Sequence, residues 1–165
     1  MHNGFRHLRY TVQWMQPITA RHAKAAQRAL AGQMTEKLGA DWRLWSRSHS
    51  RGTVAVAAGN SPLTQLGVDV EYADPRRPWR AIAATYMPEF RGDPGIDVST
   101  LCRLWTFGEA HLKAFGSVPD PSVLDRVMQT RPPGDEPVAF ANRRYWYSEA
   151  LPDSFWLTLV WEEEI

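Results

Sequence analysis

Residues 66–71 constrain the fold of this 165-residue chain more than any other segment. Three aliphatic residues alternate there with one glycine and two carboxylates, in the order Leu66, Gly67, Val68, Asp69, Val70 and Glu71. Side chains alternate between the two faces of a β-strand, so the segment predicts a strand with one aliphatic and one acidic face. We expect Gly67 to keep the start of the acidic face open. The alternative is a surface strand whose carboxylates are simply solvated.

The neighbouring sequence predicts a second buried strand and three helices. Residues 53–58 form a β-branched and alanine run between Gly52 and a turn cluster, which indicates a buried strand. Good helix formers, a first-turn proline and capping residues mark the helices. We expect them at residues 20–34, at residues 78–90, and from Ser99 or Thr100 to Phe115. Gly116 is expected to end the third helix.

The last third of the chain predicts two late strands after a turn at residues 132–135. Residues 155–161 are apolar on both faces, which is typical of a central strand. Taken with the helices, these strands predict an α+β fold in one compact unit. At this length the hydrophobic core needs no disulfide or metal for stability.

Two features favour a cytoplasmic location. The only cysteine, Cys102, lies on an apolar helical stripe and is expected to be buried, which indicates a reducing compartment. Residues 1–14 contain no apolar run long enough for a signal peptide or a membrane span. We therefore expect no membrane association.

Charge is distributed unevenly along the chain. Up to Asn60 there are nine Lys or Arg and two acidic residues, whereas from Ser61 onward there are ten and sixteen. Such polarity suits a polyanionic ligand on one side and a metal ion on the other, although unevenly scattered surface charge explains it equally well. Nucleic-acid binding is a weaker alternative, because most aromatic residues fall at core periodicities and the pI is near 8.0.

Three segments carry reactive groups in a fixed order. They are the Ser-His-Ser-Arg-Gly turn at 48–52, the Gly-Val-Asp-Val-Glu strand at 67–71, and the helical Trp-Thr-Phe-Gly-Glu-Ala-His-Leu-Lys-Ala at 105–114. Each alone is common. Together they resemble the surfactin-synthetase-activating type of 4′-phosphopantetheinyl transferase. The resemblance extends from about residue 21 to the C-terminus, with specific matches only within residues 48–116.

The resemblance implies transfer of the phosphopantetheine arm of coenzyme A to a serine of an acyl or peptidyl carrier protein, with release of 3′,5′-ADP. A divalent cation held by carboxylates can neutralise the charge that builds on the phosphoryl oxygens. Asp69, Glu71 and Glu109 are the expected ligands. The sequence leaves open whether the ion is Mg²⁺, our first expectation, or Mn²⁺, and which carrier protein is served.

Glu109 and Lys113 are the expected catalytic residues. Glu109 or a metal-held water would take the serine proton, and Lys113 would meet a phosphate oxygen or the developing charge. The alternative is a surface ion pair four residues apart on a helix. The resemblance implies that His49 and the first-helix residues Arg28 and Arg21 bind coenzyme A. Ser48 and Lys113 are expected to bind it with them. For His49 the alternative is a side chain that stabilises a turn.

The resemblance also implies an architecture. We expect two similar halves, residues 1–63 and 64–165, each an antiparallel sheet packed with a helix and related by a pseudo-twofold. Coenzyme A would lie in the cleft between them. Because both halves belong to one chain, we expect a monomer, with an acidic carrier-protein helix drawn to the basic first part.

This chain departs from the family pattern at two places. Gly108 stands where the family helix has lysine, and residues 117–119 replace a second glycine after Gly116. The segment before Ser48 is also short. A catalytically impaired relative that only binds coenzyme A or a carrier protein is therefore the main alternative. In an active enzyme, by contrast, Arg103 or a basic residue of the first helix would replace the missing charge. A separate expectation is that Gly108 faces the apolar stripe and admits a neighbouring backbone.

Overall fold

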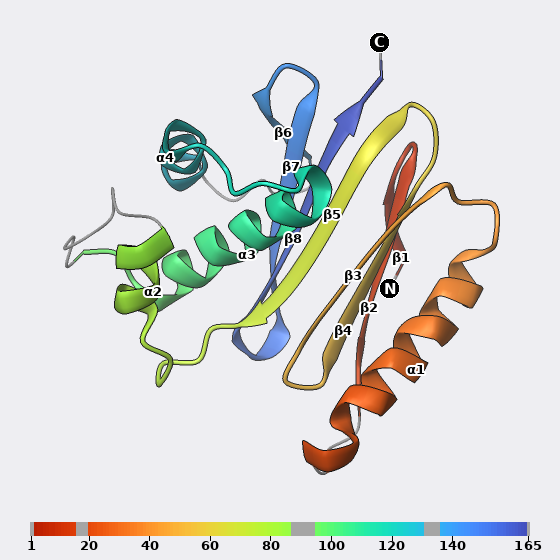
Figure 1. The fold of residues 1–165 in the computed structure, drawn as a ribbon, viewed down its shortest axis with the longest axis horizontal. Coiled ribbons are helices and arrows are strands. Elements are labelled where there is room, and N and C mark those ends of the chain that lie inside the picture. Colours follow the sequence, from red (N-terminus) through yellow and green to blue (C-terminus); the bar gives the residue numbers. More distant parts are fainter. Residues whose placement is uncertain (1, 16–19, 87–94, 131–135, 165) are drawn as a thin grey trace.

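We describe a computed structural model of the chain, which covers residues 2–15, 20–86, 95–130 and 136–164. Two four-stranded antiparallel sheets with helices packed against them make up these residues, so the predicted α+β class is confirmed (Figure 1). The first sheet contains, in spatial order, β1 (His2–Phe5), β2 (Leu8–Trp14), β4 (Thr53–Gly59) and β3 (Leu44–Ser50). The second contains β5 (Leu63–Tyr72), β8 (Phe155–Glu163), β7 (Arg144–Leu151) and β6 (Val138–Ala141).

The first sheet is covered on its outer face by α1 (Ala20–Leu38). Met34 is fully buried in a cluster with Val54 and Val56 of β4. The opposite face of β4, with Ala55 and Ala57, packs into the core shared with the second sheet. Both faces of β4 are therefore covered, which explains why the strand is buried along its whole length and confirms that prediction.

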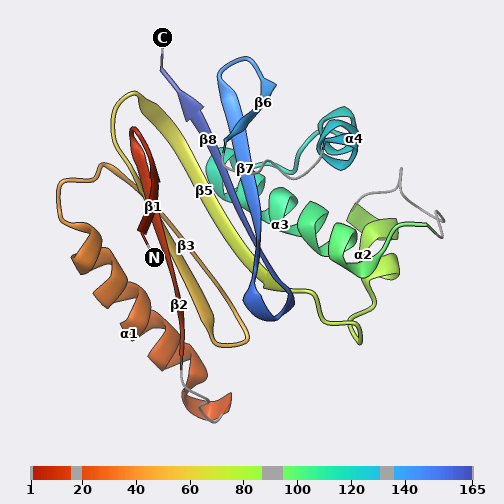
Figure 2. The ribbon, with the colours of Figure 1, turned by 180° about the vertical axis from the view of Figure 1, so that it is seen from behind.

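The second sheet packs against α3 (Val98–Phe115), which lies on the side of the molecule away from α1 (Figure 1, Figure 2). Gly67 sets how closely β5 and α3 approach, because a Cβ at this position would lie 1.9 Å from the Ala110 carbonyl oxygen. The expectation that Gly67 keeps the acidic face open is therefore wrong. This glycine admits the backbone of the helix.

The cap of α3 also differs from the prediction. The carboxylate of Asp97 accepts a hydrogen bond of 2.6 Å from the Thr100 backbone N–H, so the cap is Asp97 and not Ser99 or Thr100. Gly116 ends the helix at φ 72°, as predicted. The observed helix starts earlier than expected because an aspartate cap satisfies the same orphan donors as a hydroxyl cap.

The remaining elements surround α3. The predicted helix at residues 78–90 is present as α2 (Trp79–Tyr86). Residues 87–90 of that prediction lie outside the described residues, as does the turn at residues 132–135. Strand β8 is central and buried, as predicted. Sequence patterns did not predict β1, β2, β6 or α4 (Pro121–Gln129), or the short 3₁₀ turn η2 (Pro152–Ser154). Within the described residues, no helix is long and apolar enough to cross a membrane.

The two sheets meet where β3 and β5 run side by side (Figure 1, Figure 2). The first sheet takes its strands from residues 2–59 and the second from residues 63–163, so the chain changes sheet next to the predicted boundary at residue 63. Leu66, Val68 and Val70 of β5 point into the core between the sheets. The acidic residues of β5 therefore lie on the opposite side, toward α3, which confirms the predicted division of its faces.

Candidate functional site

Serine side chains of β3 protect the free edge of β5. Ser46 Oγ accepts a hydrogen bond of 2.9 Å from the Val68 N–H, and Ser50 Oγ accepts one of 3.2 Å from the Tyr72 N–H. An exposed strand edge carries unpaired backbone groups, which these hydroxyls satisfy. Segment 48–50 is thus the end of a strand, and the expected turn is confined to residues 51 and 52, both with positive φ.

The same row of serines donates to the carboxylates of β5. Ser48 Oγ donates to Asp69 Oδ1 at 2.6 Å, and Ser50 Oγ donates to Glu71 Oε1 at 2.5 Å. Ser48 and Ser50 are buried, whereas His49 lies on the other face of the strand and is exposed. Because side chains alternate along β3, the two serines of this motif contact β5, whereas His49 is exposed on the other face.

Asp69 is the most buried charged group near the strand edge, with only 6% of its surface exposed. Lys113 Nζ donates to its Oδ1 at 2.8 Å and to the Val68 carbonyl oxygen at 3.0 Å. Burial raises the pKa of Asp69 to about 6, although Lys113 and Ser48 both lower it. Burial therefore disfavours the charged form of Asp69 even though Lys113 pairs with it.

Glu71 is paired with an arginine that the sequence analysis did not single out. Arg77 Nη1 lies 2.9 Å from Glu71 Oε2, and its guanidinium lies over the rings of Trp79 and Trp105 at 4.6 and 5.2 Å. The position of Arg77 shortly after the acidic strand, within an Arg-Arg-Pro sequence, was the available signal.

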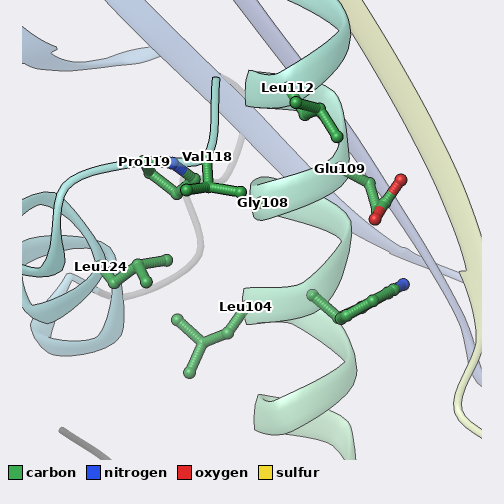
Figure 3. A pocket seen from close by; sticks show the side chains of 8 residues that line it. Leu104, Gly108, Glu109, Leu112, Val118, Pro119 and Leu124 are labelled. Atoms are coloured by element: carbon green, nitrogen blue, oxygen red, sulfur yellow. The ribbon is translucent and has the colours of Figure 1, made fainter. Parts of the chain in front are cut away.

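The carboxylate of Glu109 makes no hydrogen bond or ion pair with any residue that the structure describes. It is half-buried on α3, and its carboxylate projects from the opposite side of the helix to Val118 and Pro119 (Figure 3). Lys113, one turn later, pairs with Asp69 instead. The surface pair between Glu109 and Lys113, considered as the alternative, is therefore not the observed arrangement.

These side chains line one open cleft of about 400 Å³, which we call the central cleft. Strands β3 and β5, helix α3 and the segment before α2 contribute to it. Its lining residues are Arg47, Ser48, His49, Asp69, Val70, Glu71, Arg77, Trp105, Glu109 and Lys113. Four segments that lie far apart in the sequence thus meet at one surface.

No family model matches the chain, and a search of curated proteins finds no significant relative. The functional assignment therefore depends on the residues of the central cleft and on their geometry. Six of the residues predicted for the site lie in its lining, including all of the expected metal ligands and both expected catalytic residues.

The two predicted residues of the first helix are not part of this lining. Arg28 is exposed on α1, which packs against the far side of the first sheet. Arg21 belongs to α1, but its side chain lies outside the described part of the structure. Their contact with coenzyme A stays a prediction.

Gly108 faces open space. A Cβ at this position would have no atom within 4 Å, so the expectation that Gly108 admits a neighbouring backbone is wrong. It borders an apolar pocket of about 90 Å³ between α3 and the start of α4, seen in Figure 3. The residues lining it are Leu104, Trp105, Gly108, Glu109, Leu112, Val118, Pro119 and Leu124. Trp105 and Glu109 line both this pocket and the central cleft, so the two adjoin each other.

Arg103 does not supply charge to the central cleft. It is 5% exposed and donates hydrogen bonds to the carbonyl oxygens of Thr130 and Met128 at the end of α4. It therefore ties two helices together, and the idea that Arg103 replaces the missing lysine is not supported. Arg47 and Arg77 are the arginines that line the cleft.

Proposed function

We propose that this chain is a 4′-phosphopantetheinyl transferase, which moves the phosphopantetheine arm of coenzyme A to a serine of an acyl or peptidyl carrier protein with the help of Mg²⁺. Residues 1–63 and 64–165 would be its two halves, related by a pseudo-twofold. Coenzyme A would occupy the central cleft.

The observation that carries the proposal is the convergence of three motifs on this cleft. The segments around Ser48, Asp69 and Glu109 are distant in the chain, and the sequence resemblance depends on all three. If their similarity to the family pattern were accidental, nothing would require them to meet. Their shared cleft is what a common substrate demands.

The charges of the cleft fit coenzyme A and a cation together. Its carboxylates are Asp69, Glu71 and Glu109, and its basic side chains are Arg47, His49, Arg77 and Lys113. A pyrophosphate needs cationic donors, whereas a divalent metal ion needs carboxylate oxygens. A cleft that carries both sets suits a metal-bound pyrophosphate better than it suits either partner alone.

The acidic set fits a hard cation by its chemistry, because all three members are carboxylates. Asp69 Oδ2 and the Glu109 carboxylate have no polar partner among the described residues, and a cation would relieve the unfavourable burial of Asp69. Glu71 is occupied by Ser50 and Arg77. Within the described residues, no three His, Cys, Asp or Glu side chains lie close enough together to hold an ion. Asp69 and Glu109 would hold the metal first, with Glu71 joining them.

The bound metal would supply charge neutralisation at the phosphoryl oxygens. The serine hydroxyl of the carrier protein attacks the phosphorus that bears pantetheine, and the bond from that phosphorus to the leaving 3′,5′-ADP breaks. Glu109, which lines the cleft without a polar partner among the described residues, takes the serine proton. Lys113 places an ammonium group beside the phosphates while it stays anchored to the β5 edge.

A catalytically impaired relative that binds coenzyme A or a carrier protein is the second candidate. Gly108 favours it, because the family lysine is missing and Arg103 is buried elsewhere. Such a protein would use the same cleft without efficient transfer.

The deciding experiment incubates the chain with coenzyme A, Mg²⁺ and carrier proteins from fatty-acid, polyketide and peptide synthases. Intact-mass analysis then measures the product. A gain of one phosphopantetheine group on a carrier protein supports the transferase. Binding of coenzyme A by calorimetry without any mass gain on the three carrier types supports the impaired relative.

A further inference from the structure

Arg77 occupies an unusual position for a residue that only stabilises a loop. Its guanidinium lies in the wall of the central cleft, and its side chain is 31% exposed. Trp79 of α2 and Trp105 of α3 lie within 4.6 and 5.2 Å of it. Contact with two indole rings restricts the guanidinium while its remaining N–H groups stay available.

The ion pair of Arg77 involves only part of each partner. Arg77 uses Nη1, and Glu71 uses Oε2, because Glu71 Oε1 already accepts from Ser50 and from the Tyr72 N–H. Glu71 is thus fixed at one oxygen by the strand edge and neutralised at the other by Arg77. Moving Arg77 would free Oε2 without disturbing the anchored oxygen.

We propose that Arg77 is an anion-binding residue that exchanges partners, leaving Glu71 for a phosphate oxygen when a metal-bound pyrophosphate enters the central cleft. The exchange conserves charge pairing. In the protein alone, Arg77 neutralises Glu71 and Lys113 neutralises Asp69. A divalent cation takes over the carboxylates, and the released guanidinium meets the phosphate charge.

The proposal rests on the proposed function for the identity of coenzyme A, but inorganic pyrophosphate tests the anion site independently. Arg77→Gln removes the positive charge of this one side chain from the cleft. Arg76→Gln is the matched control, because Arg76 is the neighbouring residue, is 79% exposed and pairs with Asp74 outside the cleft. Calorimetry measures Mg²⁺ alone, then pyrophosphate and coenzyme A in the presence of Mg²⁺.

If Arg77 exchanges Glu71 for a phosphate oxygen, its substitution should affect the binding of anions and of Mg²⁺ in opposite directions. Arg77→Gln should bind pyrophosphate and coenzyme A roughly ten- to hundredfold more weakly, because a charge-assisted hydrogen bond to phosphate is lost. The same variant should bind Mg²⁺ alone at least as tightly as the unaltered chain, because Glu71 no longer needs to release an arginine. Arg76→Gln should change neither affinity. If Arg77 were purely structural, Arg77→Gln would lower the affinities for Mg²⁺, pyrophosphate and coenzyme A together.

Arg77→Lys guards against a folding defect, because it keeps the charge but loses the planar fork. It should retain the Mg²⁺ affinity of the unaltered chain and bind pyrophosphate more weakly. Equal pyrophosphate affinities for the unaltered chain and either Arg77 variant would overturn the proposal, even if phosphopantetheine transfer is observed. A second outcome separates the two proposals. If Arg77→Gln loses pyrophosphate binding but the unaltered chain transfers nothing to carrier proteins, the anion site is supported and the transferase is refuted.

Discussion

The Ser48 hydroxyl donates a hydrogen bond of 2.6 Å to Asp69 Oδ1 and thereby connects the edge strands of the two sheets. Ser48→Ala removes a donor from a buried carboxylate, so we expect the free energy of unfolding to fall by about 1–3 kcal/mol. Urea denaturation measures this change. His49→Ala, at the exposed neighbouring position, should stay within about 0.5 kcal/mol of the unaltered chain. Equal losses of unfolding free energy for the two variants would show that this bond does not stabilise the contact between β3 and β5.

Two glycines should respond oppositely to the same substitution. In Gly67→Ala the new methyl group would overlap the Ala110 carbonyl of α3, so we expect destabilisation by about 3 kcal/mol. In Gly108→Ala the methyl group meets open space in a helix, and the variant should gain about 1 kcal/mol. Thermal unfolding compares both. A stable Gly67→Ala protein would contradict the observed contact between β5 and α3.

His111 predicts a loss of stability at acidic pH. Burial lowers its pKa below 6.5, and the charge of Arg144 acts in the same direction. The folded state therefore resists the proton that the unfolded state accepts, so this residue's contribution is present above pH 6.5 and is lost as the pH falls below it.

Urea denaturation at pH 8 and pH 5 checks the sign. His111→Phe cannot take up a proton and keeps an aromatic ring beside Phe107 and Phe115. The unaltered chain should lose more stability between the two pH values than this variant. Equal losses would mean that His111 is not buried as a neutral side chain.

Much of the structure of residues 64–165 was predictable from periodicity. The alternation in residues 66–71 correctly separates a core face from an acidic face, because a half-buried strand has a strong period of two. The helix ending at Gly116 was also predicted, since its stripe and its terminal glycine agree. These are local signals that tertiary contacts reinforce.

The errors arose where tertiary contacts decide. Gly67 looked like an opening in the acidic face, and only the path of α3 shows that it admits the Ala110 backbone. Ser48 looked like part of a turn, and only the position of β5 shows that its hydroxyl donates to the Asp69 carboxylate. Arg77 gave no periodic signal, because its role follows from two tryptophans on different helices.

Gly108→Lys tests the departure from the family pattern. The position faces open space, so the lysine should be accommodated without loss of melting temperature. If the missing charge limits catalysis, the rate of phosphopantetheine transfer should rise with little change in coenzyme A affinity, because the charge would act on the transition state. An unchanged rate in a stable protein would mean that a cleft cation such as Arg77 already fills that role.

Transfer by Glu109→Gln tests the central claim most directly. Intact-mass spectrometry follows single-turnover transfer from coenzyme A to a carrier protein with Mg²⁺, for the unaltered chain, Glu109→Gln and the control Glu36→Gln. Glu36 is exposed on α1, so the control makes the same chemical change away from the cleft. We predict that Glu109→Gln slows transfer about a hundredfold or more, whereas Glu36→Gln has no effect. Equal transfer by all three proteins would contradict the assignment of the central cleft as the active site.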